Sequence, residues 1–99
     1  MSILPGTAID FETITVSTTV IGLTAGKVSP VSGETPNAVM ITSEDGPVRY
    51  RVDGEDPTSA EGHEMWTGQE LWLRDTALSL FRAVRQGSTD AKLRVTYFR

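Results

Sequence analysis

Cysteine is absent from the 99 residues of this chain. Disulfide bonds, thiolate metal sites and a cysteine nucleophile are therefore excluded. A disulfide-free domain is compatible with cytosol, virion or extracellular space, so this absence does not identify the compartment.

Histidine occurs once, as His63, in a glycine-rich acidic loop. No nucleophile-elbow pattern accompanies it, and the spacing of Glu61, His63 and Glu64 matches no established transition-metal site. Carboxylate pairs of glycosidases are defined only in three dimensions, and a sandwich of this length has little room for a substrate cleft. We expect no catalytic residues, no enzyme activity and no cofactor.

Long apolar runs and a surplus of basic residues are also missing. No run approaches the roughly 20 residues of a membrane-spanning helix, and the N-terminus lacks the features of a secretion signal. The net charge is −4, and the excess lies in residues 1–45, where Lys27 stands against Asp10, Glu12, Glu34, Glu44 and Asp45. We therefore expect a soluble protein that binds neither membrane nor nucleic acid.

Short β-branched and alternating segments dominate what is present. Alternation is clearest at 48–53, where Val48, Tyr50 and Val52 should form the buried side. The expected strands are 9–23, long or broken, then 38–43, 48–53, 70–73, 79–84 and 92–98. Residues 75–87 also fit a short helix, although a strand is favoured there. The pattern predicts an all-β fold, an antiparallel immunoglobulin-like β-sandwich of about six to eight strands.

The segments between these strands are read as loops. Residues 24–36 and most of 53–68 collect glycine, proline and polar side chains. Asp45-Gly46 predicts a tight turn between two apolar strands. Asp53, Glu55 and Asp56 form a weak candidate calcium site, but the same residues are ordinary turn formers, so we expect no metal.

Candidate partner-binding residues come from three places. Arg49 and Arg51 share the polar face of their strand, either as a solvated face or as a docking face. Trp66 lies in the long loop, whereas Trp72 lies inside a strand and is expected to fill the core. Residues 1–8 are expected to form an N-terminal arm that docks on a neighbouring subunit through Ile3 and Leu4, and 9–99 a single domain.

Two resemblances join these features. Tyr50, Asp53-Gly54 and Asp56-Pro57-Thr58 match a strand-turn signature of the immunoglobulin-like C-terminal module of chitobiases and β-hexosaminidases, with Ala83 and Tyr97 in similar later positions. Residues 23–30 and the final VTY strand resemble small virion proteins of tailed bacteriophages. The start at Met1, with no enzyme preceding it, favours the phage resemblance.

The phage resemblance implies a non-enzymatic capsid decoration or cement protein, which stabilises the assembled head. Its partner would be the major capsid protein or another virion protein, and it would act as a homo-oligomer in a virion assembled in the host cytoplasm. The alternatives are a head-tail or tail component, or a carbohydrate- or receptor-binding module that uses Trp66 and residues 54–68. An aromatic platform would favour the module, whereas a buried Trp66 and an ordered N-terminal arm would favour decoration.

Overall fold

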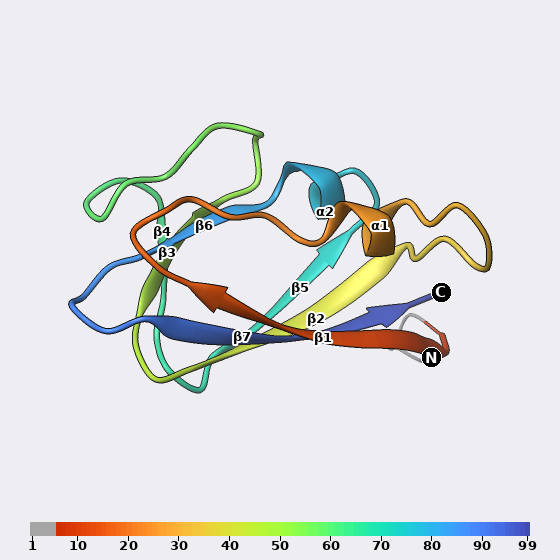
Figure 1. Ribbon diagram of the computed structural model, residues 1–99, viewed down its shortest axis with the longest axis horizontal. Coiled ribbons are helices and arrows are strands. Elements are labelled where there is room, and N and C mark those ends of the chain that lie inside the picture. The colour runs from red at the N-terminus through yellow and green to blue at the C-terminus, as the bar shows by residue number, and fades with distance from the viewer. Residues whose placement is uncertain (1–5) are drawn as a thin grey trace.

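The computed structural model describes residues 6–99, and within them seven strands form two antiparallel sheets (Figure 1). The elements in chain order are β1 (Ala8–Val16), α1 (Ala25–Val28), β2 (Ala38–Glu44), β3 (Val48–Arg51), β4 (His63–Met65), β5 (Glu70–Arg74), α2 (Ala77–Leu80), β6 (Arg82–Arg85) and β7 (Ala91–Phe98). The fold is an all-β sandwich, which confirms the prediction from β-branched content and alternation.

The larger sheet has the strand order β1-β7-β2-β5, and the smaller sheet β4-β3-β6. The last strand therefore lies between the first and the second. In immunoglobulin constant domains the first two strands are neighbours instead. This chain thus has the immunoglobulin-like division into four and three strands with a different order. Thr7 and Arg99 exchange backbone hydrogen bonds of 3.0 and 2.9 Å, which continue the β1–β7 pairing.

Alternate residues of the strands fill the space between the sheets. On β7, Leu93, Val95 and Tyr97 are fully buried, as the alternation predicts. Phe81, which follows α2, is also fully buried. The remaining members of this core cluster are Ile14, Val16, Val39, Ile41, Val48, Met65, Leu73, Leu78, Ala83 and Ala91.

The predicted Asp-Gly turn joins β2 to β3. Asp45 adopts a φ of 70°, in the left-handed region that Asp tolerates better than most side chains. Its carboxylate accepts a hydrogen bond from Lys92 Nζ at 3.2 Å. This bond ties the turn to β7, while the turn itself connects the larger sheet to the smaller one.

Three expectations about local structure need correction. The strand expected over 9–23 ends at Val16, and afterwards only Ile21 forms an isolated bridge, to Ala83. Residues 24–36 contain the single turn α1, and 53–68 contain the edge strand β4. Pairing with β3 explains β4, since Met65 lies opposite Val48 and is buried despite the polar sequence around it.

Residues 75–87 combine both predicted structures. They form one helical turn, α2, and then the strand β6. Leu78 and Phe81 are three positions apart and both are buried in the core. A helical turn places them on the same side, so their burial favours helix over strand here. The strand expected over 79–84 therefore starts later, at Arg82. No helix among the described residues is long and apolar enough to cross a membrane.

Candidate docking face on the four-stranded sheet

The outer face of the larger sheet carries a row of side chains that crosses all its strands. Phe11 of β1 lies opposite Thr96 of β7. Thr96 lies opposite Met40 of β2, and Met40 lies opposite Trp72 of β5. Phe98 lies two residues beyond Thr96 and so on the same face of β7. We call Phe11, Met40, Trp72 and Phe98 the aromatic patch.

The aromatic patch is partly assembled within the chain. The ring centroids of Trp72 and Phe98 are 5.3 Å apart, at an angle of 37°. Ala38 lies opposite Phe98 on this face and is fully buried, as expected where two rings meet over a small side chain. Phe11 remains 53% exposed, and the other three members are half-buried. An apolar surface is therefore open to solvent here.

The opposite end of the outer face is polar, and its charges are paired within the chain. Arg94 donates to both carboxylate oxygens of Glu44 at 3.1 Å, and to Thr13 Oγ1 at 2.8 Å. The hydrogen bond from Arg94 lowers the pKa of Glu44. Since these charges already have partners, the aromatic patch is the part of the face that gains most from an external contact.

The aromatic patch was not predicted from the sequence, although the sequence contains a signal for it. Each member occupies the polar side of the alternation in its own strand, as Phe98 does after Arg94 and Thr96. Trp72, expected in the core, is half-buried on the outer face because its neighbours Leu71 and Leu73 take the inward positions. The signal was an apolar residue at a position where alternation predicts a solvent-facing polar one. The register of the strands places these residues on one face.

The two arginines predicted to bind a partner are engaged within the smaller sheet. Arg49 Nη1 donates to the Gly62 carbonyl at 2.9 Å, and its Nη2 lies 3.8 Å from Glu64. Arg51 donates through Nε to Asp53 Oδ1 at 3.0 Å and through Nη2 to Oδ2. Both guanidinium groups therefore already hold loop 53–62 or the edge strand.

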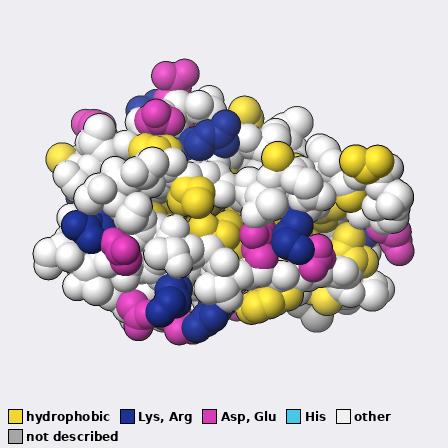
Figure 2. Space-filling view, viewed as in Figure 1, with side chains coloured by type: hydrophobic (Ala, Val, Ile, Leu, Met, Phe, Trp, Pro, Cys, Tyr) yellow, Lys and Arg dark blue, Asp and Glu magenta, His cyan; other side chains and the backbone are white. Residues whose placement is uncertain are grey.

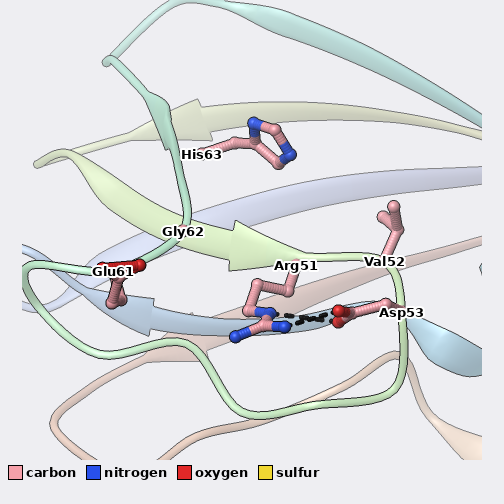
Figure 3. Close-up of a pocket in the computed structure, with 6 residues that line it drawn as sticks. All are labelled: Arg51, Val52, Asp53, Glu61, Gly62 and His63. Carbon is pink, nitrogen blue, oxygen red and sulfur yellow. Dashed lines mark hydrogen bonds and ion pairs between the residues drawn. The ribbon is translucent and has the colours of Figure 1, made fainter.

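A shallow depression of about 430 Å³ lies beside this loop (Figure 3). Arg51 and Asp53 point toward each other there, while the His63 ring points away from them. The His63 ring centroid lies 5.4 Å from that of Tyr50. The hydrogen bond from Arg51 lowers the pKa of Asp53 to about 2. The side chains of the Arg51–Asp53 ion pair and of His63 therefore do not point toward a common binding position in the depression.

The carboxylates of the weak calcium candidate are arranged as a turn. Asp53 Oδ1 accepts the backbone N–H of Glu55 at 3.2 Å, in addition to its bonds from Arg51. Among residues 6–99, no group of three or more His, Asp or Glu side chains is placed to hold a metal ion.

Trp66 follows β4, is 54% exposed and is not a member of the aromatic patch. Its backbone N–H is bound by Gln69 Oε1, and its carbonyl accepts Ser43 Oγ at 2.7 Å. These bonds fix the turn that presents the indole. Ile3 and Leu4 of the predicted arm lie outside the described residues; of the remainder, Ala8 begins β1.

Charges of both signs are mixed over the surface. On the side shown in Figure 2, basic and acidic side chains lie next to each other in several places. Comparison with protein-family models, curated proteins and solved structures finds no match to this chain. Function is therefore inferred from the geometry of the chain, together with the sequence resemblances given above.

Proposed function

We propose that this chain is a non-enzymatic virion protein of a tailed bacteriophage, a decoration protein that binds the assembled head through the aromatic patch. The observation that carries the proposal is an apolar surface left open on the same sheet face as the paired charges of Arg94 and Glu44. Contiguous exposed apolar surface rimmed by polar groups is typical of protein interaction sites. The assignment to a phage head comes from the resemblance of residues 23–30 and the final strand to small virion proteins.

A protein partner fits the aromatic patch better than a sugar does. Sugar binding needs polar groups that converge beside a stacking ring. Here the Glu70 carboxylate accepts the Trp72 indole N–H at 3.0 Å, and Arg94 is held by Glu44 and Thr13. The patch also includes the flexible thioether of Met40, which adapts to irregular apolar surfaces. Aromatic side chains with Met are enriched at the cores of protein interfaces.

Cosedimentation with emptied phage heads that lack this protein tests the proposal. We expect saturable binding at a stoichiometry that matches the capsid lattice. Phe11→Ser should weaken the binding about tenfold or more, because hot-spot truncation costs about 1–2 kcal/mol or above. Val31→Ser is the matched control, since Val31 is a fully exposed apolar side chain outside the patch. Absence of saturable binding, or equal affinity of both variants and the unaltered protein, would refute the proposal.

A buried Trp66 was expected for a decoration protein, but Trp66 is exposed, and its indole favours a second candidate, a carbohydrate-binding module. An exposed tryptophan at a fixed turn can stack on a sugar ring. A glycan array probed with the unaltered chain, Trp66→Ser and Phe11→Ser separates the two. Glycan binding that is lost in Trp66→Ser and kept in Phe11→Ser would establish this second function instead.

A further inference from the structure

The strand β5 has one free edge and a sequence that is complementary to itself. It is the last strand of the larger sheet, and within residues 6–99 it pairs only with β2. Its residues read Glu-Leu-Trp-Leu-Arg from Glu70 to Arg74. When two copies of this segment are aligned antiparallel, Glu lies opposite Arg, Leu opposite Leu and Trp opposite Trp.

The hydrogen-bonding groups at the free edge belong to the outward-facing residues. Asp75 N–H donates to the Asn37 carbonyl at 2.9 Å, so Asp75 directs its backbone groups toward β2. Alternate residues of an antiparallel strand direct these groups to opposite sides. Leu73 and Leu71 therefore also bond toward β2. The N–H and C=O groups of Glu70, Trp72 and Arg74 point away from the sheet.

We propose that β5 pairs antiparallel with β5 of a second copy of this chain, about a two-fold axis at Trp72. Trp72 then faces Trp72 of the other copy, and Glu70 faces its Arg74. Each of these pairs exchanges both backbone hydrogen bonds, because the free groups belong to the same three residues. The two larger sheets become one continuous sheet.

Charge complementarity selects a second copy as the occupant of this edge. Charges on an edge strand usually prevent pairing, and like charges directly opposite are destabilising. Here the opposite ends of one strand carry opposite charges, so the two-fold pairing turns both into cross-strand ion pairs. Arg74 is exposed and makes no ion pair with the described residues. On the inner face, half-buried Leu71 meets Leu73 of the second copy.

The pairing would also enlarge the apolar surface formed by the aromatic patch. Trp72 is the member of the aromatic patch nearest the free edge, so the two patches would adjoin across the axis. The inference goes beyond the proposed function, and it is tested on the purified chain alone. If the chain does not bind heads, the dimer can still be observed. If the chain does not dimerise, head binding can still be observed.

Charge reversal tests the register by sedimentation velocity. We expect a concentration-dependent dimer of the unaltered chain. Glu70→Arg should raise its dissociation constant about tenfold or more, because two attractive pairs become repulsive. Arg74→Glu should do the same, and the double variant E70R/R74E should restore dimerisation. A monomer at all concentrations, or a dimer indifferent to both single reversals, would overturn the proposal.

Cysteine cross-linking tests the axis directly, since the chain has no cysteine of its own. Glu70→Cys and Arg74→Cys should each remain uncross-linked when oxidised alone. Mixed together they should form a disulfide-linked heterodimer, because hydrogen-bonded antiparallel pairs have Cα atoms about 5.5 Å apart, within disulfide range. Cross-linking of either variant with itself, or none in the mixture, would contradict the two-fold pairing.

Discussion

The Tyr97 phenol is a buried polar group that links three elements in the interior. It is fully buried, and its hydroxyl donates to the Glu12 carboxylate. The same carboxylate accepts the Thr24 hydroxyl and, at 3.3 Å, the Thr24 backbone N–H. One carboxylate therefore ties β7, β1 and the start of α1 together.

Replacing Tyr97 with Phe should destabilise the fold. The change removes a hydrogen bond to a charged group and leaves the ring in place, which costs about 1.5–3 kcal/mol. Equilibrium unfolding in urea measures the loss. Thr96→Val, on the outer face of the same strand, is the control and should change the free energy of unfolding far less.

The same residue sets the stability of the chain in alkali. Burial, and then the hydrogen bond to Glu12, raises the pKa of Tyr97 above its ordinary value of 10.0. In the unfolded chain the phenol ionises near pH 10, so its stabilising contribution is complete below that pH and falls as the pH rises further. The difference in stability between the unaltered chain and Tyr97→Phe should therefore shrink above about pH 10. A difference that is constant from pH 8 to about pH 11 would contradict this account.

Asp53 offers a residue-scale test in acid. Its pKa is lowered to about 2, first of all by the hydrogen bond from Arg51. Carbon-detected NMR titration of the Asp53 carboxyl should show this low midpoint, and Arg51→Gln should move it up toward the ordinary 3.8. Because the folded pKa is depressed, the associated stability is present above about pH 4 and is lost as the pH falls toward 2. An unshifted midpoint in Arg51→Gln would show that Arg51 is not the cause.

At the scale of elements, Gly62 is the position that lets the long loop return to β4. It adopts a φ of 130°, and a Cβ there would lie 3.0 Å from the Tyr50 carbonyl oxygen and 3.2 Å from Pro57 Cβ. The Gly62 carbonyl also accepts the hydrogen bond from Arg49. The approach of loop and strand β3 therefore requires a residue without a side chain.

Gly62→Ala should accordingly destabilise the chain by about 1 kcal/mol or more. Gly26→Ala is the matched control, because a Cβ at Gly26 in α1 meets nothing within 4 Å. That change should stabilise the chain by about 0.4–1 kcal/mol through the unfolded state. Thermal unfolding of the two variants should thus shift in opposite directions, and equal shifts would contradict the geometry assigned to Gly62.

The elements that could be predicted were those with a strong local pattern. The alternation of Leu93, Val95 and Tyr97 identified β7, and the β-branched runs identified β1 and β2. Edge strand β4 could not be predicted, since its pairing with β3 and the burial of Met65 decide it. The single turns α1 and α2 are too short to carry a helical period.

At the scale of the whole molecule, the sandwich could be predicted and the arrangement of its strands could not. Insertion of β7 between β1 and β2 depends on contacts between the two ends of the chain. The aromatic patch has the same origin, because the β1–β7 register places Phe11 opposite Thr96, two residues from Phe98 on the same face. Composition guided the expectations about function, whereas the aromatic patch could be recognised only from the three-dimensional register of the strands.

The most direct test of binding through the aromatic patch is to measure which tryptophan becomes covered when the chain binds phage heads. Trp66→Phe leaves Trp72 as the only tryptophan, and Trp72→Phe leaves Trp66. Acrylamide quenching of each variant is compared free and head-bound. The docking-face account predicts that head binding protects Trp72 and leaves the exposed Trp66 as accessible as before. Protection of Trp66 with no change at Trp72 would contradict it and would place the interface at the turn after β4.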